Sequence, residues 1–207
     1  ARRQRQMCIR DRFSDEEILQ LEKVHQALSI IQFKLENQLI KRRPEFQMQE
    51  HVMLDKIDYW EESVTIDDTK HALVNTCFQT INPENPSALT PEENQAVDSM
   101  LASFQSSLKM AEHMSLLMNK GSMYKIYNQH LLFHGCIPLE PSGEFQPFIL
   151  NQAHYSGKEL LDFFEYHIRQ AAKDKEVGDD LSTDLIWYCW KGKLSPLFGK
   201  EKMTTLE

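Results

Sequence analysis

His134 has the setting in this sequence that most favours chemistry. It follows the apolar run Leu131-Leu132-Phe133 and precedes Gly135. A histidine at the end of a strand, with a glycine that lets the backbone turn sharply away, projects its imidazole into the cleft at the sheet edge. Imidazole commonly binds divalent transition metals, so His134 is a candidate metal ligand. The alternative is a structural histidine held by hydrogen bonds, and a lone histidine does not decide between the two.

Lys41, Arg42 and Arg43 form a basic cluster at the end of a predicted helix. Cations interact favourably with the C-terminus of a helix, which is the simpler interpretation. The alternative is a phosphate-binding cluster, because the guanidinium fork of arginine matches phosphate oxygens. The lysine- and glycine-containing loop 191–200 could also hold a phosphate, but it does not match GxxxxGK[ST] and is expected to be a surface loop.

Hydrophobic periodicity and capping signals place these residues on an α+β framework. Ser14 and Glu17 form a capping box that opens a helix ending near Arg42, and Thr90 and Glu93 open another. In order, we predict helices over 14–42 and 48–59, strands over 63–66 and 72–74, a helix over 90–121, and a hairpin of strands 123–127 and 131–133 with its turn at 128–130. A helix opened by Ser156 and Glu159 and an aromatic segment 187–190, expected in the core, complete the chain.

Composition excludes several classes of protein. The 207 residues carry 23 Lys and Arg against 31 Asp and Glu, a net charge of −8, which argues against a nucleic-acid-binding surface. The longest apolar run, 185–190, is far shorter than the roughly 20 residues of a membrane span. The four cysteines are scattered without CxxC spacing, and no HExxH motif occurs, so a cysteine zinc site or a disulfide framework is not expected. A cytoplasmic setting fits this cysteine usage.

Residues 1–12, ARRQRQMCIRDR, hold five arginines and show no periodicity. A disordered basic arm is one interpretation. We favour another, because residues 7–12 resemble the translation of an adapter used to prepare sequencing libraries. On that hypothesis residues 1–12 are an artefact and lie outside the fold.

Three long segments carry a resemblance to one family: IIQFKLENQLIKRRPEF (30–46), KGSMYKIYNQHLLFHGCIPL (120–139) and WYCWKGKLSPLFGKEKMTT (187–205). They resemble the class III fructose-1,6-bisphosphatases. The resemblance implies a calcineurin-like metallophosphatase fold, a β-sandwich flanked by helices, with a dinuclear site that usually holds manganese. It also implies hydrolysis of the 1-phosphate of fructose 1,6-bisphosphate, a gluconeogenic step. Two metals of this kind activate a water and neutralise charge on the phosphoryl oxygens.

The resemblance makes His134 one metal ligand and suggests Lys41, Arg42 and Arg43 as substrate contacts. The other metal motifs of such sites, DxH, GDxxD, GNH[DE] and GHx, do not occur, and the second aspartate that 178–180 would need is replaced by Ser182. We therefore expect an internal fragment that is inactive by itself. Residues 13–120 would form a mainly helical insertion, and 121–207 a truncated part of the catalytic domain.

Two other functions stay open. One is a different calcineurin-like phosphatase, for example a protein phosphatase, and the other is a non-enzymatic helical interaction module. The expected partner is a small sugar bisphosphate, with neither nucleic acid nor membrane, and a homo-oligomer is possible.

Overall fold

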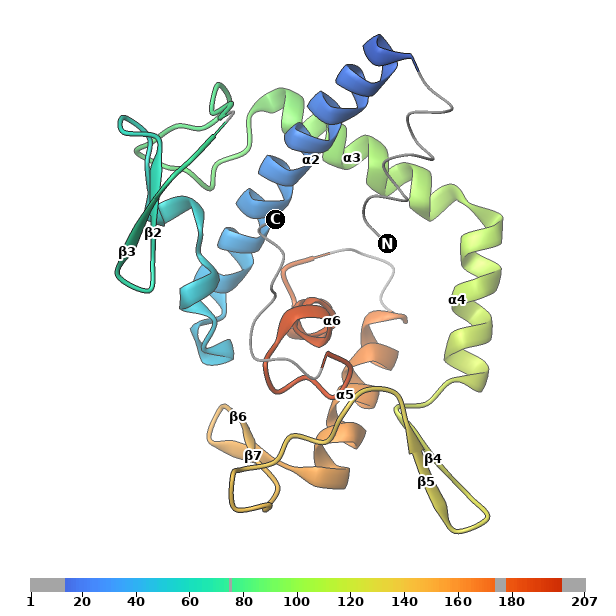
Figure 1. The fold of residues 1–207 in the computed structure, drawn as a ribbon. Coiled ribbons are helices and arrows are strands. Elements are labelled where there is room, and N and C mark those ends of the chain that lie inside the picture. The colour runs from blue at the N-terminus through green and yellow to red at the C-terminus, as the bar shows by residue number, and fades with distance from the viewer. Residues whose placement is uncertain (1–13, 75, 174–177, 199–207) are drawn as a thin grey trace. The chain divides into compact units, whose positions relative to one another are not determined.

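The computed structural model describes residues 14–74, 76–173 and 178–198, which form the expected α+β mixture (Figure 1). Residues 1–12 lie outside these described residues, so the structure does not test whether they are an artefact. Two compact units are present. The first holds the described residues up to Arg42 together with Gln49–Asp98, and the second holds Arg43–Met48 and the described residues from Ser99 onward. The division into an insertion (13–120) and a catalytic part (121–207) concerns the full-length protein and stays a prediction.

The first unit is built on α2 (Asp15–Arg42), which confirms the predicted first helix. The Ser14–Glu17 capping box forms: the Glu17 amide donates to Ser14 Oγ at 3.3 Å, and the Ser14 amide donates to Glu17 Oε2 at 2.8 Å. Acidic residues occupy the first turn and basic residues the last, so both ends complement the helix dipole.

The predicted helix over 48–59 is wrong. The chain instead makes two short 3₁₀ turns, η2 (Gln49–His51) and η3 (Leu54–Lys56), and then the strand β1 (Ile57–Asp58). The hydroxyl of Tyr59 donates to the Leu54 carbonyl at 2.7 Å. In an α-helix that carbonyl would accept from the amide of Asp58, so the tyrosine satisfies the acceptor that a continuing helix would need.

β1 pairs with β2 (Ser63–Ile66), which pairs with β3 (Thr69–Ala72), all antiparallel. The prediction of β2 is confirmed, whereas the strand predicted at 72–74 shares only Ala72 with β3. Asp67 and Asp68, both with positive φ, form a two-residue loop that sets Ile66 opposite Thr69.

The predicted helix over 90–121 is interrupted. It consists of α3 (Pro91–Ser106) and α4 (Leu108–Lys120), and Ser107 between them has an extended ψ of 107°. Ser107 caps α4, because its Oγ accepts from the Met110 amide at 3.3 Å. The capping box that opens α3 is confirmed, with the Thr90 amide donating to Glu93 Oε2 at 2.8 Å.

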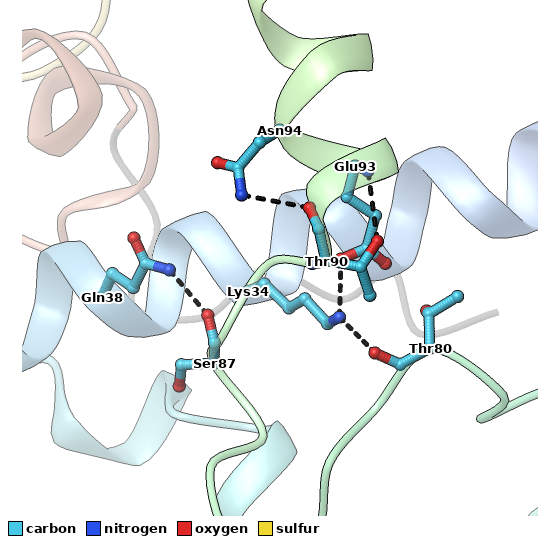
Figure 2. A network of polar contacts seen from close by, with 7 residues as sticks. All are labelled: Lys34, Gln38, Thr80, Ser87, Thr90, Glu93 and Asn94. Carbon is cyan, nitrogen blue, oxygen red and sulfur yellow. Dashed lines mark hydrogen bonds and ion pairs between the residues drawn. The ribbon is translucent and has the colours of Figure 1, made fainter.

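A buried lysine joins α2 to the start of α3 within the first unit (Figure 2). The ammonium of Lys34, whose side chain has no exposed surface, lies 2.7 Å from Glu93 Oε2 and 2.6 Å from the Thr80 carbonyl oxygen. One turn further along α2, Gln38 donates to the Ser87 carbonyl at 2.6 Å. The capping glutamate thus serves both the helix end and a buried cation.

The second unit contains two hairpins and two packed helices. β4 (Tyr124–Tyr127) and β5 (His130–Phe133) confirm the first hairpin, although its turn is Asn128-Gln129 and His130 already belongs to the strand. The hairpin of β6 (Phe148–Leu150) and β7 (Ala153–Tyr155) was not predicted.

The core of this unit lies between α5 (Gly157–Ala171) and α6 (Leu181–Lys191). The ring of Tyr188 lies 5.1 Å from that of Phe148 and 5.0 Å from that of Phe46, which belongs to η1 (Pro44–Phe46). Tyr188 is buried, as expected for the aromatic segment, whereas Trp190 is 55% exposed. In the described ranges, no helix is long and apolar enough to cross a membrane.

Candidate functional site

His134 lies one residue beyond the end of β5 and is exposed. The register pairs Tyr124 with Phe133, so the histidine emerges at the end of the hairpin where β4 begins. This is the strand-end position that the sequence predicts. Its role as a ligand stays a prediction.

The glycine after this histidine is needed for a close backbone approach. A Cβ atom on Gly135 would lie 2.4 Å from the carbonyl oxygen of Pro196, and the next amide, that of Cys136, donates to the same oxygen at 3.0 Å. Any side chain at position 135 would break this contact, since real Cβ atoms do not approach an oxygen so closely. The His-Gly segment is therefore fastened to the loop after α6.

That loop is itself held by Ser195, which is fully buried. Its hydroxyl donates to the Cys189 carbonyl at 2.6 Å, and its Oγ accepts from the Leu197 amide at 3.1 Å. The Ser195 hydroxyl therefore makes its hydrogen bonds within the protein and holds the loop in its conformation. This favours a structural role over phosphate binding for residues 191–198. The last two residues of the loop as predicted, 199 and 200, lie outside the described residues.

A second anchor fixes the start of the same hairpin, and sequence analysis did not find it. Arg169 on α5 bonds the carbonyl oxygens of Met118 and Gly121, the latter at 2.9 Å, at the end of α4. Its partner Glu165, 2.8 Å away, accepts from the amide of Met123 at 2.9 Å. Arg169 thus supplies donors to carbonyl oxygens at the end of α4, where carbonyls have no hydrogen-bond donor within the helix. Its only signal in the sequence is the Glu-to-Arg spacing of four residues.

The basic cluster at the end of α2 meets acidic partners. Lys41 Nζ lies 2.7 Å from Asp55 Oδ2 in the first unit, and Arg42 is half-buried as the last residue of the helix. In the second unit, Arg43 Nε donates to Asp184 Oδ2 at 2.7 Å, and Asp184 is almost fully buried. Carboxylates thus neutralise Lys41 and Arg43 in this chain. Contact of the three residues with substrate stays a prediction.

The segment 178–180 is the part of the chain that partly matches the GDxxD metal motif. In the structure its last residue, Asp180, is the N-cap of α6. Asp180 Oδ1 accepts from the amides of Ser182 and Thr183 at 2.8 and 3.0 Å, and Oδ2 accepts from the Thr183 hydroxyl at 2.5 Å. The hydroxyl bond from Thr183 is the main reason that the pKa of Asp180 lies below its usual value. An ionised N-cap carboxylate of this kind stabilises the start of the helix.

Across the part of the chain that the structure describes, no three His, Cys, Asp or Glu side chains lie close enough together to hold a metal ion. Manganese takes about six ligands, mostly oxygens, in octahedral geometry. One exposed imidazole supplies a single donor, so the described residues do not fit a complete manganese site.

Comparison with known proteins defines the class. Residues 3–207 match the family described as Firmicute fructose-1,6-bisphosphatase, and the chain belongs to this family. It is 97% identical over 195 residues to the fructose-1,6-bisphosphatase class 3 of Streptococcus sanguinis strain SK36. The aligned region covers 94% of this chain and 31% of that protein. The matching protein of Streptococcus gordonii is 82% identical over the same shares.

The protein of the same name from Staphylococcus aureus strain Newman is 51% identical over 197 residues, covering 95% of this chain and 30% of the relative. The chain thus spans about a third of the length of these relatives. No solved structure matches it. The resemblance seen in the three sequence segments is confirmed, and the family is neither a protein phosphatase family nor a non-enzymatic one.

Proposed function

We propose that the full-length protein containing this chain hydrolyses the 1-phosphate of fructose 1,6-bisphosphate, giving fructose 6-phosphate and phosphate, as a step of gluconeogenesis. The observation that carries this proposal is the 97% identity over 195 residues to a fructose-1,6-bisphosphatase class 3. Within this region, which is 31% of that relative, so close a similarity leaves few positions at which the activity could have changed.

Within that protein, the proposed metal is manganese and the proposed fold is a calcineurin-like β-sandwich. His134 is the proposed ligand from this chain, and its exposed position at a strand end supports the role. Lys41, Arg42 and Arg43 are proposed substrate contacts, which requires that Lys41 and Arg43 exchange their carboxylate partners for phosphate oxygens. A cytoplasmic location is supported by the free thiols of Cys77, Cys136 and Cys189. The oligomeric state proposed is a homo-oligomer.

The test replaces His134 by alanine in the full-length protein and measures both bound manganese and turnover of fructose 1,6-bisphosphate. Mutation of a residue that only hydrogen-bonds a metal ligand typically lowers metal affinity or activity by about 10- to 100-fold. Loss of a ligand itself should have a larger effect, so we expect kcat to fall by more than about 100-fold and the metal content to fall with it. His130 is the matched control, because it is an exposed histidine on β5, the strand that His134 follows. His130→Ala should change turnover by no more than about twofold. Unchanged metal content in His134→Ala would remove this residue from the site.

A further inference from the structure

The β4–β5 hairpin has one face that is mainly apolar. Cross-strand pairing of Tyr124 with Phe133 and of Ile126 with Leu131 places these four side chains on the same side, because side chains alternate along a strand. We call these four residues the apolar face. The opposite side carries Lys125, Tyr127, His130 and Leu132, a mixture typical of a solvated surface.

Three of the four side chains of the apolar face are exposed in this chain, and the fourth, Tyr124, is half-buried with the ammonium of Lys158 over its ring. Ile126 is 67% exposed, Leu131 47% and Phe133 43%. Figure 1 shows the hairpin (yellow) projecting from the end of α4. A hairpin of two strands is at best marginally stable by itself in water and gains stability when one face is packed against another layer. The pattern of this hairpin is therefore that of a sheet whose covering layer is missing.

The hairpin is nevertheless held in place at one end. Arg169 and Glu165 on α5 bond the end of α4 and the amide of Met123, the residue just before β4. The apolar face is thus a preformed surface on the second unit, exposed even though its position relative to α5 is fixed.

An open depression of about 500 Å³ adjoins this face, between α5 and the start of the hairpin, and its lining is mixed. It includes Lys125 of the opposite face as well as Tyr124 and Ile126. The two acidic groups of α5 in its wall are already neutralised, since Glu165 pairs with Arg169 and Asp162 pairs with Lys158. Whatever fills the depression therefore needs no cations to balance these carboxylates. A segment that presents apolar side chains to the apolar face fits best, since it would remove Ile126, Leu131 and Phe133 from water.

The relatives of this chain indicate where such a segment comes from. The chain corresponds to only 31% of the Streptococcus sanguinis protein, so about two thirds of the polypeptide lies outside it. We propose that the apolar face and the adjoining depression are covered, in the full-length protein, by a segment of the same polypeptide from outside the 207 residues. This inference rests on membership of the family, and it holds whether or not the proposed catalytic activity is confirmed.

Leu131 and Leu132 provide a matched pair for the test. They are neighbours on β5, 47% and 53% exposed in this chain, and they lie on opposite faces of the hairpin. Each is replaced by cysteine in the full-length protein, and labelling by a maleimide is followed at that site by peptide mass spectrometry. We expect Leu131→Cys to react more than about tenfold more slowly than Leu132→Cys, and both to react equally fast in denaturant.

Equal rates in the native protein would overturn the proposal. So would protection of Leu131→Cys that disappears when the protein is diluted to a monomer, because a second copy would then be the cover.

A second pair of variants controls for local disturbance of the structure by the introduced cysteines. Leu131→Asp should lower the thermal unfolding midpoint of the full-length protein by more than about 5 °C, and Leu132→Asp by much less, because only the first buries a charge. Equal shifts would contradict an interface on one face.

Discussion

Burial separates the cysteines of this chain by reactivity. Cys189 on α6 is 5% exposed, and burial raises the pKa of its thiol to about 12, whereas Cys77 is exposed. The thiolate is the reactive form, so Cys77 should label with iodoacetamide at pH 8 more than about 100-fold faster than Cys189. Mass spectrometry of the 207-residue chain after timed labelling measures both rates. Comparable rates would mean that the α5–α6 core opens readily.

Single residues also mark the limit of sequence analysis at the candidate site. The place of His134 at a strand end could be predicted, because the apolar run and the glycine beside it are local signals. The partners of the basic cluster could not be predicted, because they are not local in sequence. Asp184 lies 141 positions from Arg43, and Asp55 lies 14 positions from Lys41. The chain bends at this glycine, as expected, but no signal in the sequence indicates that it also admits the Pro196 carbonyl, which belongs to a distant loop.

Among the elements, the contact between α2 and the start of α3 depends on one buried ion pair (Figure 2). Burial raises the pKa of Glu93, but hydrogen bonds from Lys34 and the Thr90 amide outweigh it, and the net pKa lies below the usual 4.5. A lowered pKa in the folded state means that the folded protein favours the carboxylate. Its contribution to stability is therefore complete above pH 4.5 and is lost as the pH falls through the lower, folded-state pKa.

Glu93→Gln tests this contact by leaving Lys34 buried without its counter-ion. We expect the free energy of unfolding at pH 7 to fall by about 3 kcal/mol. The loss of stability between pH 5 and pH 3 should also become shallower than in the unchanged chain, as measured by urea unfolding. Glu61→Gln is the control, because its pair with Lys70 is exposed and should matter little. Equal effects of the two substitutions would refute a special role for the buried pair.

Helix starts and hairpin loops show how local signals succeed and fail. The capping boxes at Ser14 and Thr90 form as predicted, but Ser156 makes no side-chain cap bond. Gly157, the next residue, has a φ of 52°, and a Cβ atom there would lie 3.1 Å from the Phe145 ring, so this helix start depends on a glycine rather than on a side-chain cap. Three hairpins have two-residue loops with positive φ at both positions, Asp67-Asp68, Asn128-Gln129 and Asn151-Gln152, none of which contains the glycine that usually signals such a loop.

At the scale of the whole molecule, charge and length bear on what the chain can do alone. Its net charge of −8 repels a sugar bisphosphate, so attraction must come from local cations or bound metals. Carboxylates of this chain already occupy Lys41 and Arg43, and His134 is one donor where a dinuclear site needs many. The metal site that we propose for the full-length protein would therefore need groups from the two thirds of the relatives' length that lies beyond this region.

We accordingly expect the 207-residue chain alone to release no phosphate from fructose 1,6-bisphosphate above background in a manganese buffer in which the full-length protein is active. Equilibrium dialysis should likewise find less than one tightly bound manganese per chain, because a lone imidazole binds the ion weakly. Circular dichroism of the same sample controls for folding, since the helices α2 to α6 make up much of the chain. Manganese-dependent turnover by the chain that His134→Ala abolishes would show instead that these residues form a working site without the rest of the polypeptide.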